Sequence, residues 1–264
     1  MDILQRINQA KREEVATSRV SRPPEELERS VHFNRSIRSL SNSILSSEQF
    51  GIIAEFKRRS PSKGDIRAGA VVDEIVPGYA AVGAAAISVL TDQSYFGGSS
   101  ADLLQARRLV DVPLLRKDFI VDEYQILEAR ALGADAILLI AASLTPEQLK
   151  RFTTYAHALG LEVLLEVHDL QELEVGLEAG ADLIGVNNRN LKTFHTDLNT
   201  SRLLIRHIPA SVVAIAESGI ESPEVIAEFR NLGYRGFLIG QHFMQQPDPP
   251  TACQELIKSV LLVS

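Results

Sequence analysis

The sequence has almost no cysteine, no long apolar run and no apolar leader. Cys253 is its one cysteine among 264 residues, which excludes an intrachain disulfide and a cysteine metal cluster. No apolar stretch approaches the ~20 residues that a membrane-spanning helix needs, and the first residues lack the apolar core of a signal peptide. These absences predict a protein of the reducing cytoplasm with no membrane partner and no metal.

Positive charges are fewer than negative ones. The formal net charge is -7 at pH 7, which argues against nucleic acid as the main partner. The chain is 45% hydrophobic and 23% charged, as in folded globular proteins. Its length suits one barrel-sized domain or two smaller ones.

The stretch before the first predicted strand is expected to be helical. Ile3 and Ile7 have the spacing of an amphipathic helix, and we interpret the charged run 11–14 as the solvated face of that helix. A second, weaker helix is expected between residues 25 and 40. The serine-rich segment 39–47 is expected to be a loop.

From Gly51 onward, apolar strands alternate with segments of helical periodicity. The strands are continuous apolar runs, as in parallel sheets covered on both faces. We therefore predict an α/β fold, a (β/α)8 TIM barrel of residues 49–264. Residues 1–48 have too few large apolar side chains for a core of their own and would form an N-terminal helical extension packed on the barrel. The eight predicted strands are Ile52–Phe56, Ala86–Leu90, Pro113–Lys117, Ala136–Ile140, Glu162–Glu166, Leu183–Asn187, Val212–Ala216 and Gly236–Ile239.

A glycine that ends a helix recurs at nearly equal intervals, at Gly83, Gly133, Gly180 and Gly233. Each would adopt positive φ just after its helix. The four glycines precede the second, fourth, sixth and eighth predicted strands, so one repeat corresponds to a quarter of a barrel. A doubly wound open sheet can also hold eight strands, but the fourfold period favours closure. In addition, no G-x-G-x-x-G fingerprint follows the first strand.

Charged and amide side chains stand at the carboxyl ends of the predicted strands. Glu55 and Lys57 are two residues apart and should share one face, while Phe56 points the other way. A barrel of this kind carries its active site on this rim, so the convergence of strand ends predicts one polar pocket. The other rim side chains are Lys117, Glu166, Asn187, Arg189 and Glu217.

The predicted pocket suits acid–base chemistry on an anionic ligand. We expect crowding to lower lysine pKa values and burial to raise those of the carboxylates, as proton transfer near neutral pH requires. Ser218 and Gly219 after the seventh strand, with Gly240 and Gln241 after the eighth, match the phosphate position of such barrels.

Several other polar residues are interpreted as structural. His168 has no cysteine or second histidine nearby, so we interpret it as a loop residue and not a ligand. The arginine pairs 58–59 and 107–108 are expected to be solvated. Cys253 is expected to be inert within the last helix.

Seven motifs occur in order along the chain, at residues 53–57 with 60–64, 89–92 with 96–99, 117–120, 164–168, 185–191, 216–220 and 237–240. Together they resemble the indole-3-glycerol phosphate synthase family, and the resemblance covers essentially the whole chain. It implies a cofactor-independent lyase of tryptophan biosynthesis. The enzyme would convert 1-(2-carboxyphenylamino)-1-deoxyribulose 5-phosphate into indole-3-glycerol phosphate, with loss of carbon dioxide and water. The sequence departs from the family pattern at Gln241 and Phe243.

The resemblance also implies roles for the site residues. Lys117 would be the general acid of ring closure and Glu166 the general base of dehydration. Glu55 and Lys57 would assist them, and Glu217 would position polar groups. Asn187 and Arg189 would hold the anthranilate carboxylate or orient the site. Ser60, Ser218, Gly219, Gly240 and Gln241 would surround the phosphate, and the aromatic ring would lie among Pro61, Phe96, Phe119 and Leu138. Leu238 and Ile239 would also bind the substrate.

Three alternatives fit less well. A phosphoribosylanthranilate isomerase would carry a cysteine at the end of the first strand, and a metal-dependent epimerase would carry histidine and aspartate ligands. A non-catalytic phosphate-binding barrel would have no need of Lys117 and Glu166.

We expect a monofunctional enzyme that is a monomer or weak homo-oligomer. We also expect loop 60–67 to close over the substrate, because Gly64 and Gly69 bracket it.

Overall fold

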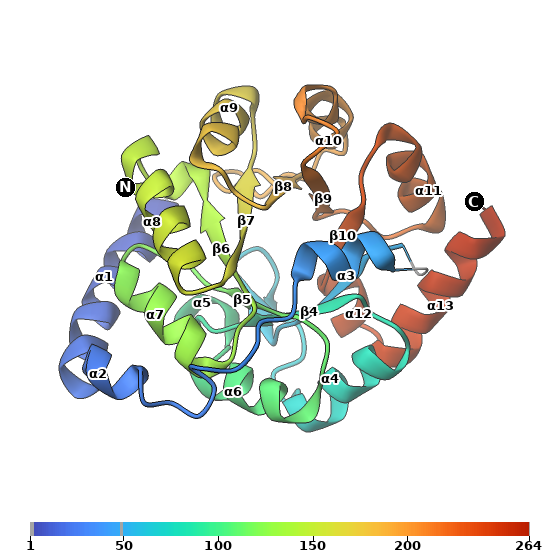
Figure 1. Ribbon diagram of the computed structural model, residues 1–264. Coiled ribbons are helices and arrows are strands. Elements are labelled where there is room, and N and C mark those ends of the chain that lie inside the picture. Colours follow the sequence, from blue (N-terminus) through green and yellow to red (C-terminus); the bar gives the residue numbers. More distant parts are fainter. Residues whose placement is uncertain (1–2, 48–49, 264) are drawn as a thin grey trace.

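The chain forms a closed barrel of eight parallel strands (Figure 1). The computed structural model describes residues 3–47 and 50–263. Closure is direct, because the last barrel strand pairs in parallel with the first, so the predicted barrel is confirmed and the open sheet is excluded. Predicted and observed strand ends agree to within one residue. The barrel strands are β1 (Ile52–Phe56), β4 (Ala86–Leu90), β5 (Leu114–Lys117), β6 (Ala136–Ile140), β7 (Glu162–Val167), β8 (Leu183–Asn187), β9 (Val213–Glu217) and β10 (Gly236–Ile239).

Helices surround the strands and begin and end at local sequence signals. Asp122 caps the helix that follows β5, accepting a hydrogen bond from Tyr124 N–H at 2.8 Å. The four repeated glycines all have positive φ, between 77° and 122°, as their position after a helix requires. The helices of the barrel are α4 (Val72–Ala81), α6 (Ser100–Leu109), α7 (Glu123–Leu132), α8 (Pro146–Ala158), α9 (Leu170–Ala179), α10 (Asn199–Leu204), α11 (Pro223–Leu232) and α13 (Pro249–Val263), with short turns α5 (Gln93–Phe96), η1 (Ala141–Ser143), η2 (Ile205–His207) and α12 (Gln241–Met244).

The alternation of side chains along each strand produces two apolar layers. On β1, Ile52 and Ala54 face the helices and belong to the large outer core. Ile53 faces the barrel axis, where it packs with apolar residues of the other strands. The barrel centre is therefore filled, and polar side chains gather only where the inward-facing rows end.

The N-terminal extension comprises α1 (Ile3–Ser21), α2 (Pro24–Leu27) and α3 (Leu40–Ser46). Figure 1 shows α1 and α2 beside α7. The predicted loop over 39–47 was wrong, because Ser39 caps α3 by accepting a hydrogen bond from Asn42 N–H at 3.0 Å, and Leu40 and Ile44 are buried. The second expected helix is only the single turn α2. The predicted boundary between residues 48 and 49 lies outside the described residues.

Helix α3 covers the amino-terminal end of the barrel. Its cap residue Ser39 donates a hydrogen bond to Glu162, the first residue of β7, at 2.6 Å. Ser43 donates to the carbonyl of Ala85, just before β4, at 2.6 Å. The opposite, carboxyl end of the barrel is thus the one left for ligands.

Lys11 of α1 is buried, contrary to the expected solvated face. It lies 2.9 Å from Asp92, 3.0 Å from Asp118 and 2.9 Å from Glu14. The spacing of residues 4, 7 and 11 places Lys11 on the apolar face of the helix, where a cation is stable because the two aspartates accompany it. Its neighbours at 12–14 are exposed, as expected.

Two of the four arginines expected to be solvated are instead structural. Arg58 donates two hydrogen bonds to Asp102 at 2.7 and 2.8 Å. Arg107 is buried and donates to Asp135 at 2.9 Å. Arg59 and Arg108 are exposed. Charge runs alone did not distinguish the two kinds, because the partners lie on other elements.

A small hairpin follows β1 and was not predicted. Strands β2 (Arg59–Ser60) and β3 (Gly64–Asp65) pair antiparallel, and Gly64 has φ of 69° at the start of the second strand.

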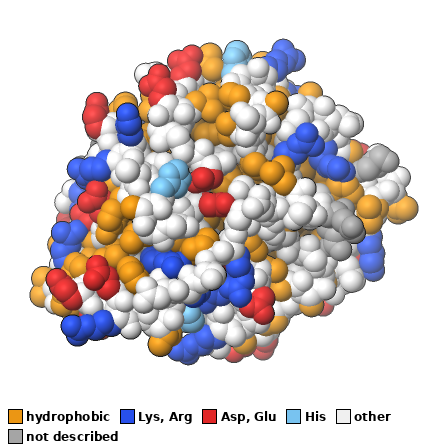
Figure 2. Space-filling model, viewed as in Figure 1, with side chains coloured by type: hydrophobic (Ala, Val, Ile, Leu, Met, Phe, Trp, Pro, Cys, Tyr) orange, Lys and Arg blue, Asp and Glu red, His pale blue; other side chains and the backbone are white. Residues whose placement is uncertain are grey.

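Figure 2 shows acidic and basic side chains interspersed over one face of the molecule. None of the helices within residues 3–47 and 50–263 combines the length and apolar character needed to cross a membrane.

Candidate active site

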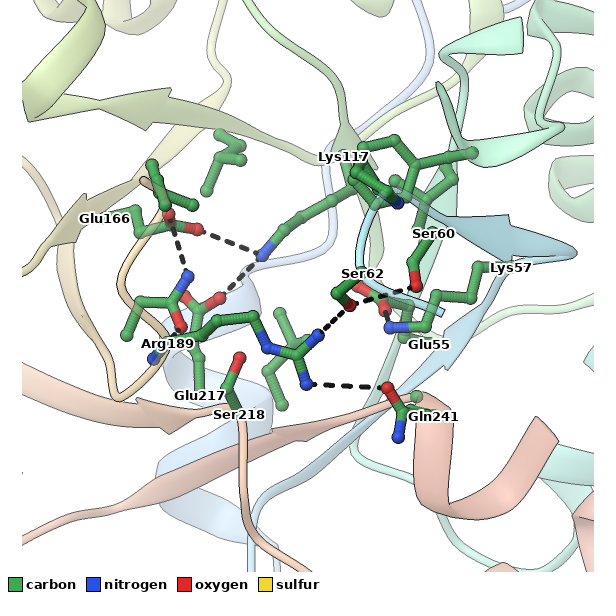
Figure 3. Close-up of a pocket in the computed structure, with 18 of the residues that line it drawn as sticks. Glu55, Lys57, Ser60, Ser62, Lys117, Glu166, Arg189, Glu217, Ser218 and Gln241 are labelled. Atoms are coloured by element: carbon green, nitrogen blue, oxygen red, sulfur yellow. Dashed lines mark hydrogen bonds and ion pairs between the residues drawn. The ribbon is translucent and has the colours of Figure 1, made fainter. Parts of the chain in front are cut away.

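A cavity opens at the carboxyl ends of the barrel strands, and every predicted site residue lies on its wall. Glu55 from β1, Lys117 from β5, Glu166 from β7 and Glu217 from β9 project into it (Figure 3). These carboxylates are nearly inaccessible to solvent, so their charges act on one another with little screening. The structure thus places the predicted residues together, and their roles stay predictions.

Lys117 lies at the centre of this charge cluster. Its Nζ is 2.6 Å from Oε2 of Glu217 and 3.5 Å from Oε2 of Glu166. Burial lowers the pKa of Lys117, but the charges of Glu217, Glu166 and Glu55 outweigh burial and raise that pKa above its usual value. The expectation of a lowered lysine pKa was therefore wrong, because more anions than cations crowd this side chain.

The two carboxylates that share Lys117 differ in their pKa values. Burial raises the pKa of Glu217 to about 7, opposed by Lys117 and reinforced by Glu166 and Glu55. Burial acts in the same direction on Glu166, but Lys117, His168 and Asn187 overcome it and lower that pKa to about 2. The expected rise is thus seen at Glu217 and not at Glu166, which has two cations and an amide donor around it.

Two glycines leave the space that the carboxylates occupy. A Cβ atom at Gly185 would lie 2.2 Å from Oε1 of Glu217, and one at Gly240 would lie 2.4 Å from Oε1 of Glu55. Either distance is a collision. Glu55 in turn lies 2.6 Å from Nζ of Lys57, so the pair predicted to share one face of β1 does so.

Arg189 reaches across the cavity from the segment after β8. Its guanidinium donates hydrogen bonds to Ser62 of the β2–β3 hairpin and, at 3.4 Å, to Gln241. Its Nε is buried without a hydrogen-bond partner among the described residues. This guanidinium can therefore donate a further hydrogen bond to an anion at the cavity wall.

The glycine-containing turns after β9 and β10 face this arginine. Ser218 and Gly219 both have positive φ, 64° and 75°, so the backbone turns directly after β9. Gly240 immediately precedes α12. With Ser60 they line the cavity.

Apolar side chains also line the cavity. The rings of Phe96 and Phe119 lie with centroids 6.0 Å apart, and Pro61 and Leu138 line the same cavity. Helix α1 completes this wall with Ile3, Leu4 and Ile7. These three side chains were not predicted as site residues, although their helical spacing showed an apolar face in need of a partner.

His168 lies in the bend between β7 and α9, as expected of a loop residue, but its contacts with Glu166 and Glu172 were not predicted. Its Nε2 lies 3.3 Å from Oε1 of Glu166, and its Nδ1 lies 3.0 Å from Oε2 of Glu172. The sequence offered one indication of these contacts, because Glu166 stands two residues before the histidine and Glu172 four residues after it. No set of three or more His, Cys, Asp or Glu side chains arranged to hold a metal ion occurs in the part of the chain that the structure describes.

A closed (β/α)8 barrel with buried acid and base groups at its carboxyl rim defines an enzyme of the TIM-barrel class. A family model for indole-3-glycerol phosphate synthase matches residues 4–256. The chain therefore belongs to the indole-3-glycerol phosphate synthase family.

Curated relatives agree with this family. The chain is 49% identical to an indole-3-glycerol phosphate synthase of Bacteroides thetaiotaomicron, with 98% of this chain and 99% of the relative covered. It is 45% identical to the enzyme of that name from Bordetella pertussis, with coverages of 97% and 99%.

Solved structures of lower identity share the fold. A thiamine phosphate pyrophosphorylase from Pyrococcus furiosus superposes with a TM-score of 0.62 at 19% identity, covering 82% of this chain and 98% of its own. A chain of the tryptophan synthase complex of the same organism gives a TM-score of 0.60 at 14% identity, with coverages of 80% and 97%. These likenesses concern the barrel alone.

Proposed function

We propose that this chain converts 1-(2-carboxyphenylamino)-1-deoxyribulose 5-phosphate into indole-3-glycerol phosphate, as family membership implies. The observation that carries the proposal is the position of Lys117, a protonated amine held by two carboxylates at the centre of the cavity. Ring closure of this substrate needs such a proton donor. Membership of the family makes the chain a lyase of tryptophan biosynthesis.

The first step forms the new ring. The anthranilate carbon that bears the carboxylate attacks the ribulose carbonyl, and Lys117 gives its proton to the carbonyl oxygen. Carbon dioxide then leaves with its bonding electrons returned to the ring, which becomes aromatic again. The raised pKa of Lys117 keeps the amine protonated before the step, and Glu217 orients it through the 2.6 Å contact.

The second step removes water. The new hydroxyl takes a proton and departs, while a base removes a proton from the five-membered ring. Glu166 is ionised across the neutral range because its pKa is lowered, and it serves as this base. Lys57, paired with Glu55 at 2.6 Å, lies on the same wall and supplies the proton to the leaving hydroxyl.

The remaining side chains hold the substrate at its two ends. The turns at Ser218–Gly219 and Gly240–Gln241, with Ser60, surround the phosphate. Arg189 and Asn187 hold the anthranilate carboxylate, and the pair of phenylalanines packs on the aromatic ring. We propose that the ligand is a phosphorylated small molecule and that the chain acts without a cofactor, as a cytoplasmic monomer or weak homo-oligomer.

The direct test measures indole fluorescence after addition of the substrate, without added metal and with EDTA present. We expect turnover by the wild-type chain. In the Lys117→Ala variant kcat should fall by about 10²-fold to 10⁴-fold, the usual contribution of a general acid. The variant should still bind the substrate. Lys150→Ala, on the exposed surface of α8, is the matched control and should behave as wild type. Absence of turnover by the well-folded wild-type chain would refute the proposal, and full activity of Lys117→Ala would refute the role of Lys117.

A further inference from the structure

We propose that His168 is a positioning residue for the reaction, which holds Glu166 in place and ionised, and that Glu172 of α9 fixes His168 for this task. The inference rests on the proposed function, since it assigns Glu166 the part of the base. It is carried by a chain of contacts that extends from the cavity to the surrounding helices.

The chain of contacts runs from Glu166 through His168 to Glu172. Nε2 of His168 lies 3.3 Å from Oε1 of Glu166, and Nδ1 lies 3.0 Å from Oε2 of Glu172. The same oxygen of Glu172 accepts the backbone N–H of His168 at 2.8 Å. Glu172 sits in the first turn of α9, where its own N–H donates to the cap residue Asp169 at 2.9 Å. The imidazole is therefore held by its backbone and by one ring nitrogen.

This geometry favours the doubly protonated ring. A neutral imidazole carries one N–H and one lone pair. Either tautomer would direct its lone pair at a carboxylate oxygen, at 3.3 Å on one side or 3.0 Å on the other. The imidazolium places an N–H on each side instead. Burial lowers the pKa of His168, but the two carboxylates outweigh burial and raise it to about 10.

Two charged side chains contact His168, Glu166 of β7 and Glu172 of α9. Of the elements packed on α9, η1 has no ionisable side chain, and α8 carries Glu147, Lys150, Arg151 and His157, none of which forms an ion pair with His168 among the described residues. Glu166 is also faced by Lys117 of β5, whose other partner is Glu217 of β9. Asn187 of β8 is uncharged.

Each oxygen of Glu166 consequently has its own neighbours. Oε1 accepts a hydrogen bond from Asn187 Nδ2 at 3.0 Å and lies against His168. Oε2 faces Lys117. His168 and Asn187 thus hold the carboxylate from behind and leave Oε2 on the side of the reacting groups. Among the described residues that line the cavity, Glu166 is present and His168 is not, so the histidine acts through the glutamate.

The Nε2 atom of His168 is buried and has no aligned hydrogen-bond partner among the residues described. Its contact with Glu166 is therefore an ion pair and not a directed hydrogen bond. A structural histidine would be expected to satisfy a buried ring nitrogen with a hydrogen bond. Here Nε2 instead forms an ion pair with Glu166, which an uncharged side chain at position 168 cannot form.

The test combines kinetics with NMR and uses three variants. His168→Gln removes the charge, and Glu172→Gln removes the group that fixes it. His157→Gln is the control, since His157 of α8 forms a 2.8 Å pair with Asp182, which lies just before β8, and neither residue lines the cavity. We expect His168→Gln to lose about 10-fold to 100-fold in kcat, as misplacement of a reacting group does, with KM close to wild type. Loss of the cation also raises the pKa of Glu166, so the acid limb of kcat should move to higher pH. His157→Gln should change neither.

The protonation of His168 is measured independently of turnover. Long-range proton–nitrogen NMR on the wild-type chain, assigned by the signal missing in His168→Gln, should show both ring nitrogens protonated at pH 8. In Glu172→Gln the ring should lose a proton at lower pH than in wild type, and the acid limb of kcat should shift as in His168→Gln. This second variant also serves if His168→Gln does not fold.

Two results would overturn the inference. One is a His168→Gln enzyme with wild-type kcat and an unmoved acid limb. The other is a wild-type His168 ring that is neutral at pH 8. Failure of the proposed function looks different, because the wild-type chain itself would then form no indole.

Discussion

At the residue scale, the site is governed by an excess of buried carboxylates over amines. Glu55, Glu166 and Glu217 are all nearly inaccessible and share the charges of Lys57 and Lys117. One consequence is that the amine of Lys117 remains protonated. Another is that Glu217 has a pKa near neutrality, about 7, while Glu166 does not.

The Glu217→Gln substitution should make the enzyme sensitive to alkaline pH. Removal of the anion that most raises the pKa of Lys117 lets that pKa fall, so the amine loses its proton at lower pH. The basic limb of kcat should therefore move to lower pH, and kcat at neutral pH should fall by about tenfold or more through misplacement of the amine. The measurement is kcat between pH 6 and 10. The exposed Glu178→Gln serves as control, and a basic limb that stays in place would contradict the assignment of Lys117 as the acid.

At the element scale, α1 belongs to the active site as much as the barrel strands do. Its apolar face lines the cavity, and Lys11 joins it to Asp92 and Asp118. Asp92 accepts the N–H of Tyr95 at 2.7 Å in the turn that carries Phe96. Asp118 accepts the N–H of Phe119 at 2.8 Å, next to Lys117. The helix thus fixes both aromatic rings through one buried cation.

Replacement of Lys11 by methionine should destabilise the fold by about 3–5 kcal/mol, because it leaves the buried Asp92 without an ion-pair partner and Asp118 with Arg116 alone. Urea unfolding measures the free-energy change. Arg12→Met, at the exposed neighbouring position, should stay within about 0.5 kcal/mol of wild type. A small effect of Lys11→Met would show that the aspartates find other partners. Steady-state kinetics of the variant would also show a raised KM if α1 shapes the apolar wall.

The elements differ in how far the sequence predicts them. The strands were predictable because a parallel strand buried on both faces reads as a continuous apolar run. Segment 39–47 was not, since serine favours caps and turns, although the Leu40–Ile44 spacing and the cap Ser39 were present. Lys11 and Arg58 were misread because their partners lie far along the chain. The same limit applies to pKa directions, which depend on distances between side chains of different strands.

At the scale of the whole molecule, the rim residues could be located before the structure was known, because closure of the barrel brings all strand ends to one edge. The fourfold spacing of glycines indicated that closure. The position of α1 over this edge could not be inferred in the same way. The spacing of apolar residues shows that α1 has an apolar face, but it does not show which part of the barrel that face contacts.

Occupation of the site should stabilise the entire fold. A ligand at 100 times its Kd adds about 2.7 kcal/mol, which for a chain of this size corresponds to a rise in Tm of roughly 5–10 °C. We expect this rise with indole-3-glycerol phosphate, measured by calorimetry. Indole-3-glycerol, which lacks the phosphate, should give a much smaller rise at the same concentration. Equal rises would place the phosphate outside the turns of β9 and β10.

The glycines that accommodate the carboxylates have a consequence for protein engineering. Gly185 on β8 has no side chain where the Glu217 carboxylate of β9 lies, and Gly240 has none where that of Glu55 lies. Each carboxylate and its glycine therefore form a matched pair across neighbouring segments. A library that randomises only the two carboxylate positions would keep both glycines, and with them the same space for a side chain, and would sample few new shapes. Conversion of this barrel to another chemistry should start by varying both members of each pair together.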